Sequence, residues 1–489
     1  GGQEVGSVWG HGAYLAPDWT ADWLHRESLF ILNLWAQEDH GQTYEDLNVE
    51  AQASLERRLQ EELRKNTYDE STGVITITPI RAQAVEYLHS YYKGLFMENP
   101  ELDELRSYYA IPKNAIKDEN RMRQMSGFFF WATWATVTER PGSNVTYTHN
   151  WPPEDLVGNK PTGDLLIWTG FSIILLLFGI GVMVFYHAKM KEEEHVDMPV
   201  EDPLMRQVIT PSMLAVKKYL WVVSILILIQ VTFGVVTAHY GVEGDGFYGF
   251  NLADILPYSI SRTWHVQLGI LWIATAWLAT GLYIAPAVSG KDPKFQKLGV
   301  NFLFICILII VAGSMIGQWM GIMQKLGLVE NFWFGHQGYE YVDLGRFWQI
   351  FLLIGLFLWL ALMVRPLLPV LRSKTSEKNL LLMFLVSSAA IALFYAAGLM
   401  WGRQTNLAIA EYWRWWVVHL WVEGFFEVFA TVVGAFLFVR LGLLRTRTAT
   451  LGVLLATVIF LSGGILGTFH HLYFSGTPTA IMALGATFS

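Results

Sequence analysis

Long apolar stretches separated by short polar ones fill this chain from about residue 163 onwards. A helix of about 20 apolar residues is long enough to cross the hydrocarbon core of a bilayer. Eight stretches reach this length, and a further apolar run near residue 478 is too short to span. The pattern therefore predicts a mainly α-helical, polytopic transmembrane bundle. The eight predicted spans cover residues 163–187, 217–240, 262–286, 297–323, 346–371, 379–401, 412–440 and 448–474.

The region before these spans is soluble in character. It holds most of the acidic residues and shows helical patterns such as 55–63 and 82–92, without a nucleophile triad, a phosphate loop or a metal-ligand spacing. We expect a soluble domain at 1–162, a linking helix and connector at 163–216, and the main bundle at 217–489. Because the chain starts Gly-Gly and ends in a short apolar run, we expect further helices beyond this sequence.

The charges of the loops predict the orientation of the bundle. Cytoplasmic loops carry an excess of Lys and Arg, and one side of the predicted bundle carries most of these residues. The soluble domain and the loops at 241–261, 324–345 and 402–412 are then expected outside. The basic side holds Lys189, Lys191, Arg206, Lys217, Lys218, Lys291, Lys294, Lys297, Arg372, Lys374, Lys378, Arg440, Arg445 and Arg447.

Composition excludes several classes of protein. The chain has 489 residues, 53% of them apolar, and a net charge of −8, with no basic face suited to nucleic acid. Its single cysteine, Cys306, excludes an internal disulfide and a C-x-x-C-H haem attachment.

Polar groups inside two predicted spans indicate a metal site. His419, Glu423 and Glu427 are spaced by four, so on an α-helix they are expected to lie on one face. His470 and His471 end the next span. Ionisable groups inside a membrane are costly and usually functional. Hydrogen bonding between helices is the alternative, but together with His265 the four histidines fall at a similar predicted depth on three helices, which favours a cofactor layer.

The types of the candidate ligand residues limit which metal ion the site can bind. Imidazole binds iron, copper and zinc, and an added carboxylate favours iron over copper. The sequence spacing alone does not decide the roles of three further residues. His265 suits an axial haem ligand or a structural histidine. The pair His239 and Glu243 suits proton acceptors or a polar rim at the lipid boundary.

At these residues the chain resembles nitric oxide reductases of the haem-copper oxidase superfamily. The stretches WWVVHLWVEGFFEVF and GTFHHLYFSGTP are similar to that family's iron-ligand helices, and the resemblance runs along nearly the whole chain. Oxygen-reducing members typically carry a Tyr four residues after the first metal histidine. Glu423 stands at that position here, which favours nitric oxide over oxygen.

The soluble region resembles the cytochrome c subunit of two-subunit nitric oxide reductases in GSVWGHGAYLAPDW and HNWPPED. The haem-binding cysteines are missing, because Gly6, Ser7, Val8 and Trp9 stand where the haem motif should end. A cytochrome-c-like domain without haem c, fused to the bundle, is similar to the single-chain, quinol-dependent branch of the family.

The resemblance implies a set of cofactors and their ligands. It implies low-spin haem b, high-spin haem b3, a non-haem iron, a calcium ion, and ubiquinol or menaquinol as the donor. No His-x-His occurs in the sequence, so the remaining haem ligands are expected beyond Ser489. The implied residues are His265 for haem b; His419, His470, His471 and Glu423 for iron; Glu423 and Glu427 for catalysis; His239 and Glu243 for quinol; and Gly12, Tyr14 and Glu340 for calcium.

The resulting expectation is a nitric oxide reductase of the bacterial cytoplasmic (inner) membrane. Its soluble domain would lie on the periplasmic side, and a homodimer is compatible with the sequence. A quinol oxidase that reduces oxygen is the nearest alternative, and a proton-coupled membrane transporter is the alternative from another class.

Overall fold

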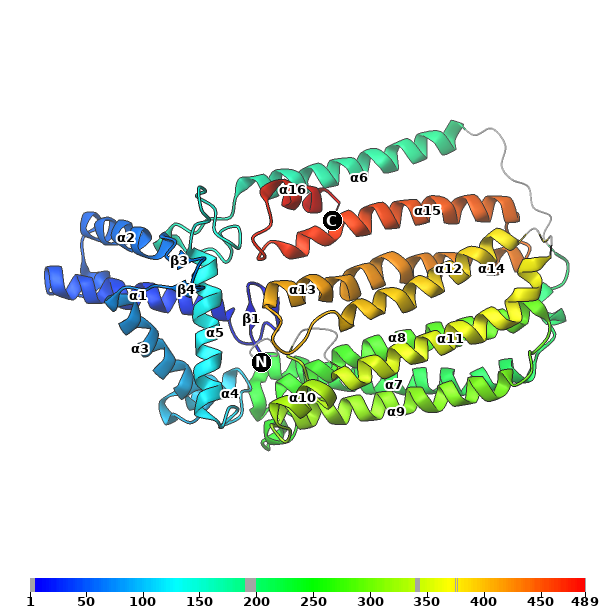
Figure 1. Cartoon of the computed structure of the whole chain (residues 1–489), viewed down its shortest axis with the longest axis horizontal. Helices are drawn as coiled ribbons and strands as arrows, with labels where there is room; N and C mark the ends of the chain where they lie inside the picture. Colours follow the sequence, from blue (N-terminus) through cyan, green and yellow to red (C-terminus); the bar gives the residue numbers. More distant parts are fainter. Residues whose placement is uncertain (1–4, 190–198, 339–343, 374, 376, 489) are drawn as a thin grey trace.

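The computed structural model describes residues 5–189, 199–338, 344–373, 375 and 377–488, and the side chains of Asp164, Leu165, Asp245 and Glu423 lie outside this description. The chain forms an N-terminal helical domain at one end of a bundle of long helices (Figure 1). The mainly helical fold predicted from the sequence is therefore confirmed.

Five helices and two short hairpins build the N-terminal domain. Asp18 caps the first helix, since its carboxylate accepts from the backbone N–H groups of Thr20 and Ala21, and Gly41 ends that helix in the left-handed conformation. The helices predicted at 55–63 and 82–92 are confirmed within α2 and α3. The elements are β1 (Ser7–Val8), β2 (His11–Gly12), α1 (Trp19–His40), α2 (Val49–Arg64), β3 (Tyr68–Asp69), β4 (Val74–Ile75), α3 (Pro79–Phe96), α4 (Asp103–Tyr108) and α5 (Glu119–Val137).

Aromatic side chains form the core of this domain. Trp19 and Trp23 of α1 are fully buried and stack on Phe129 and Tyr92, with ring centroids 5.6 and 5.4 Å apart. Each such ring buries a large apolar surface, and stacked pairs add a little beyond that burial. The domain therefore has a core of its own although it has no cysteine to attach a haem.

Among the described residues, eight helices are long and apolar enough to cross a membrane, which confirms the eight spans predicted from the sequence. The helices of this part are α6 (Gly163–Lys189), α7 (Pro211–Glu243), α8 (Tyr258–Ser289), α9 (Gln296–Ile322), α10 (Leu328–Phe334), α11 (Arg346–Arg372), α12 (Lys378–Tyr395), α13 (Leu407–Trp415), η9 (Trp416–Phe426), α14 (Glu427–Arg440), α15 (Thr446–Gly467) and α16 (Thr479–Thr487). Short 3-10 helices occupy Tyr44–Asp46, Pro100–Leu102, Asp155–Val157, Pro203–Arg206, Gly244–Tyr248, Leu252–Asp254, Ala396–Leu399 and Thr468–Leu472 (η10).

One expectation about the seventh span is wrong. A regular α-helix was expected to carry His419, Glu423 and Glu427, whereas Trp416–Phe426 is a π-helix. Its backbone hydrogen bonds join residues five apart rather than four, so the turn is wider than in an α-helix. Only Glu427 belongs to regular α-helix, as the first residue of α14.

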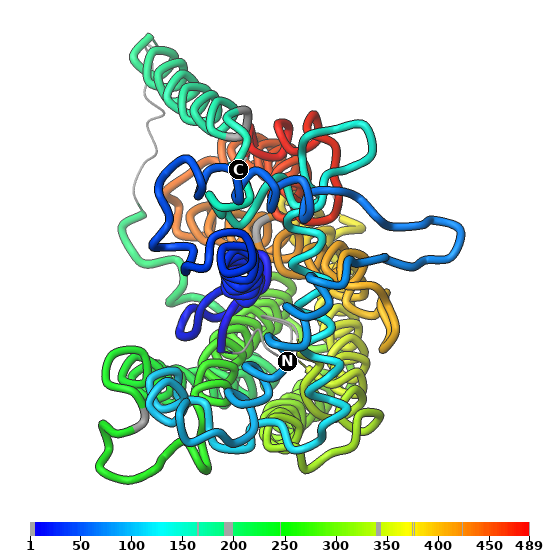
Figure 2. The backbone as a smooth tube through the Cα atoms, turned by 90° about the vertical axis from the view of Figure 1, so that its left-hand side faces the viewer, coloured from blue at the N-terminus to red at the C-terminus, as the bar shows by residue number. Residues whose placement is uncertain are grey.

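The spans are unevenly covered by protein. Half of the most apolar window of α8 is buried, whereas none of that of α6 is. Figure 2, seen from the domain end, shows α6 standing apart from the other spans, and α6 packs on α16. A helix that is apolar all round and exposed in this way is suited to lipid.

Candidate metal centre

A π-helix carries the first histidine of the candidate site. The segment η9 continues α13 and passes into α14, so the three form one rod from Leu407 to Arg440. Segments of π-helix are rare and frequently occur at functional sites. His419 lies in this segment with only 2% of its surface exposed, so the wide turn places an imidazole inside the bundle.

The neighbouring helix α15 orients this imidazole. The Nε2 atom of His419 lies 2.9 Å from the carbonyl oxygen of Gly464. Because a carbonyl only accepts, Nε2 carries the proton and donates it, which leaves the lone pair on Nδ1. That Nδ1 lies 3.2 Å from Nε2 of His471. The nitrogen able to bind a metal is therefore the one that faces the other histidines.

His470 and His471 complete a triad with His419. Both lie in η10, the 3-10 turn that ends the eighth span. One ring nitrogen from each of the three histidines lies within 4.8 Å of the others. Imidazole–metal bonds are about 2.1 Å long, so nitrogens this close can share one ion. The structure therefore brings together three of the four residues that the family resemblance implies as iron ligands.

Close packing holds the triad from two sides. The indole of Trp415 stacks on His471, with centroids 3.6 Å apart and planes at 5°. On the other side α16 approaches the backbone of His470 through Gly485, where a Cβ atom would lie 2.5 Å from the His470 nitrogen. Only a residue without a side chain allows this approach.

The triad fits a metal that binds imidazole. The Nδ1 atom of His470 is buried and has no hydrogen-bond partner among the described residues. An unpaired buried nitrogen is costly, and a bound metal ion would remove that cost. Iron, copper and zinc all suit three imidazoles. The preference for iron depends on Glu423, whose backbone lies in η9 and whose side chain is outside the described part.

His265 is not part of the triad. Its Nδ1 donates to the carbonyl oxygen of Gln230 in α7 at 2.9 Å, which leaves the lone pair on Nε2. Gly234 faces the ring so closely that a Cβ atom there would lie 2.8 Å from the imidazole. The ring is thus fixed between α7 and α8 in the tautomer that an axial haem ligand requires.

The two residues expected at the quinol lie together at the end of α7. Nδ1 of His239 is 3.1 Å from a carboxylate oxygen of Glu243, and both side chains are partly exposed. The His239 ring stacks on Phe247 with centroids 3.7 Å apart. The pair is therefore ordered and accessible from outside the bundle.

The residues expected at calcium have other contacts in the structure. The Gly12 carbonyl accepts from Arg262 at 3.3 Å, and the exposed Tyr14 hydroxyl donates to the Gly10 carbonyl at 2.8 Å. Glu340 lies outside the described residues. Glu427 is half-buried at the start of α14.

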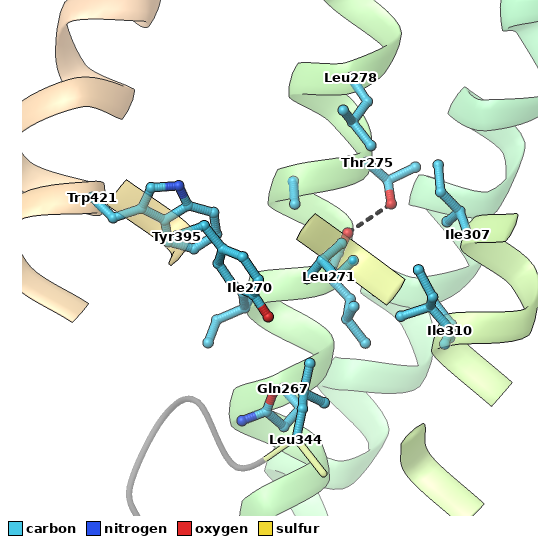
Figure 3. Close-up of a pocket in the computed structure, with 13 residues that line it drawn as sticks. Gln267, Ile270, Leu271, Thr275, Leu278, Ile307, Ile310, Leu344, Tyr395 and Trp421 are labelled. Carbon is cyan, nitrogen blue, oxygen red and sulfur yellow. Dashed lines mark hydrogen bonds between the residues drawn. The ribbon is translucent and has the colours of Figure 1, made fainter. Parts of the chain in front are cut away.

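A narrow apolar cavity of about 40 Å³ lies beside the π-helix, between it and α8, α9, α11 and α12. Figure 3 shows Trp421 and Tyr395 on one side and Leu271 and Thr275 of α8 on the other. The Tyr395 hydroxyl is buried without a hydrogen-bond partner among the described residues. A space of this size admits a molecule as small as water, not a haem.

Sequence reasoning missed the polar groups at the domain end of the triad. Arg414 and Glu411 form an almost fully buried ion pair in α13, just before the π-helix, with Nε of Arg414 2.9 Å from the carboxylate. His11 enters from the soluble domain and lies 5.6 Å from Trp415 between ring centroids. Burial, aided by the positive charge of Arg414, lowers the pKa of His11 to about 3. The signal available for His11 was its place in GSVWGHGAYLAPDW.

Comparisons with known proteins match both parts of the chain. Residues 1–153 match the family model of the cytochrome c-like domain of NorB, a subunit of nitric oxide reductase, and residues 214–489 match cytochrome c and quinol oxidase polypeptide I. The NorB subunit of nitric oxide reductase from Stutzerimonas stutzeri is 22% identical over 281 residues, which is 57% of this chain and 56% of the relative. The chain thus spans about half the length of that curated relative.

Proposed function

This chain belongs to the cytochrome c and quinol oxidase polypeptide I family of the haem-copper oxidase superfamily, and we propose that it reduces nitric oxide to nitrous oxide. The proposed reaction is 2 NO + 2 e⁻ + 2 H⁺ → N₂O + H₂O. The similarity of its N-terminal region and of a curated relative to the NorB subunit of nitric oxide reductase supports this choice.

The observation that carries the proposal is the convergence of three imidazole nitrogens within 4.8 Å in the bundle interior. We assign His419, His470, His471 and Glu423 to a non-haem iron. A bound iron would serve as a Lewis acid toward the substrate and hold it in place. Glu423 stands where oxygen-reducing relatives typically carry a Tyr, which favours nitric oxide over oxygen.

The chain's own residues have separate tasks in this proposal. Nε2 of His419 donates to the Gly464 carbonyl, which leaves the lone pair of Nδ1 for the metal. Glu423 and Glu427 offer carboxylates that can pass protons to the site. His265 would hold haem b through Nε2, and Gly12, Tyr14 and Glu340 would hold calcium.

We propose that electrons arrive from ubiquinol or menaquinol. The soluble domain has no cysteine to attach a haem, so a lipid-soluble donor is needed. His239 and Glu243 can accept its protons, because they form a partly exposed pair at the end of α7. We further propose that the protein lies in the bacterial inner membrane as a homodimer, with its soluble domain on the periplasmic side.

The test is turnover by the purified full-length protein. We expect it to consume NO and form N₂O with a quinol donor, and His419→Ala to lose this activity. Consumption of O₂ rather than NO would favour the quinol oxidase. Absence of haem bands from the optical spectrum would favour the transporter, and either result contradicts the proposal.

A further inference from the structure

The loop Tyr473–Thr477 begins two residues after the second of the two adjacent histidines, and the soluble domain binds it at several points. Its first carbonyl, on Tyr473, accepts from Nδ1 of His149 at 2.8 Å. The Gly476 N–H donates to the Tyr147 carbonyl at 3.1 Å. Arg140 donates to the Thr477 carbonyl at 2.9 Å. Three backbone groups of this short loop are therefore fixed by a domain that lies far away in the sequence.

Aromatic side chains strengthen the same junction. Phe474 is 3% exposed and stacks on Trp9 of the soluble domain, with centroids 5.2 Å apart and planes at 20°. Tyr473 stacks on His11 at 5.5 Å, and its hydroxyl donates to the Trp9 carbonyl. Phe474 thus belongs to the core of the soluble domain although it follows the eighth span.

The groups on the soluble domain are themselves held in place. Arg140 also donates to the Thr146 carbonyl at 2.8 Å and lies against His149. His149 has a φ of 56°, a conformation that residues other than Gly rarely adopt. It is supported by Asn150, whose N–H and side-chain oxygen both bond to Thr146, at 2.7 and 3.1 Å. The contact surface is therefore preformed rather than a chance meeting of flexible side chains.

The junction lies two residues from a ligand of the proposed metal. His471 is followed by Leu472 and then by Tyr473, whose carbonyl and hydroxyl are both bound by the soluble domain. The outer groups that orient metal ligands typically change metal affinity about 10–100-fold when removed. Tyr473 directly follows this short 3-10 turn, so a shift of Tyr473 would also move the backbone of His470 and His471. Fixing Tyr473 therefore restricts where the two imidazole rings lie.

We propose that the cytochrome-c-like domain acts as a clamp that positions His470 and His471 for metal binding. The domain has no cysteine to attach a haem but keeps this mechanical role toward the bundle. The inference rests on the proposed function in one respect only, that the triad holds a metal. Arg140, His149 and Tyr473 are positioning residues, since none of them offers a ligand atom to the triad.

Metal affinity of the full-length protein tests the clamp. The metal would be removed with a chelator and Co²⁺ added back at a series of free concentrations, with the bound Co²⁺ measured by elemental analysis after equilibrium dialysis. We expect Arg140→Ala to weaken Co²⁺ binding about tenfold. Tyr473→Phe keeps the ring and loses only the hydroxyl, so it should fold normally and show a smaller loss in the same direction.

Arg64→Ala is the matched control. Arg64 also lies in the soluble domain and donates to Glu139 and to the Asn144 carbonyl, at 2.9 and 3.0 Å, within that domain. Its substitution should leave the Co²⁺ affinity unchanged. Wild-type affinity in both Arg140→Ala and Tyr473→Phe would overturn the clamp. If His419→Ala bound Co²⁺ as tightly as the wild type, the metal centre itself would be wrong, which separates the two failures.

Discussion

At the scale of single residues, protonation decides what the buried histidines can do. His11 illustrates this outside the spans, because burial and the charge of Arg414 lower its pKa to about 3 from the usual 6.5. A neutral ring can stack on Tyr473 and Trp415. A charged ring at the same place would repel the Arg414 guanidinium.

His11 predicts a pH dependence of stability. The unfolded chain takes up a proton on this residue below about pH 6.5, whereas the folded chain does so only near pH 3. Stability should therefore fall as the pH is lowered through this window, by at most about 1.4 kcal/mol per pH unit from this group. Thermal unfolding midpoints of wild type and His11→Gln, compared from about pH 7.5 to about pH 4.5 on either side of the unfolded pKa, measure the effect. A difference between the two that does not change with pH would contradict the prediction.

In the proposed function, Glu423 carries the distinction between nitric oxide and oxygen chemistry. We predict that Glu423→Ala abolishes NO reduction and leaves haem b bound through His265, because the variant loses a hard ligand and a proton carrier but not the haem site. NO consumption and the reduced-minus-oxidised haem spectrum measure the two parts. Near-full turnover with normal iron content would show that Glu423 is not a ligand.

At the scale of elements, close packing of helices determines where the three histidines of the candidate metal site lie. The π-helix places His419, and η10 places the other two histidines against α16. The approach at Gly485 leaves no room, since a Cβ atom would lie 2.5 Å from one backbone atom of the 3-10 turn and 2.8 Å from another. Backbone atoms cannot rotate away as a flexible side chain can.

We therefore predict that Gly485→Ala lowers metal occupancy of the triad and costs about 1–3 kcal/mol through overpacking. Gly463→Ala in α15 is the matched control, since a Cβ atom there meets nothing within 4 Å, and Ala favours the helix. Metal content and thermal midpoint of both variants measure the difference. Equal behaviour of the two variants would mean that α16 does not pack against η10 as described.

The helices show which parts of the structure can be predicted from the sequence alone. Length and apolarity predicted all eight spans, because crossing a bilayer imposes both properties directly. The π-helix was not predictable in this way, since the spacing of His419, Glu423 and Glu427 fits α- and π-helical turns alike. The adjacent pair His470 and His471 indicated a ligand pair, but the stacking of Trp415 on His471 depends on packing between two helices.

At the scale of the whole molecule, no sequence pattern predicts the contacts between parts of the chain that lie far apart in the sequence. His149 and Tyr473 are 324 residues apart, and neither belongs to a periodic pattern that predicts their meeting. The presence of a soluble region before the spans was predictable from composition. The seating of that domain on the turn beside the histidines required the structure.

The proposed entry of electrons also concerns the whole molecule. We predict that His239→Ala or Glu243→Ala slows turnover with quinol at least several-fold and leaves NO reduction with a small artificial reductant largely intact. The reason is that the pair lies at the partly exposed end of α7, whereas His419 lies in the bundle interior. Steady-state rates with the two donors measure the effect. Equal loss with both donors would assign these residues to folding, and no loss with either would place the quinol elsewhere.

The central claim is that His419, His470 and His471 hold a non-haem iron. The most direct measurement is the non-haem iron content of the purified full-length protein, obtained as total iron minus haem iron. We predict about one non-haem iron per chain in the wild type and almost none in His419→Ala, with the haem content unchanged. Full retention of the non-haem iron in His419→Ala would contradict the account.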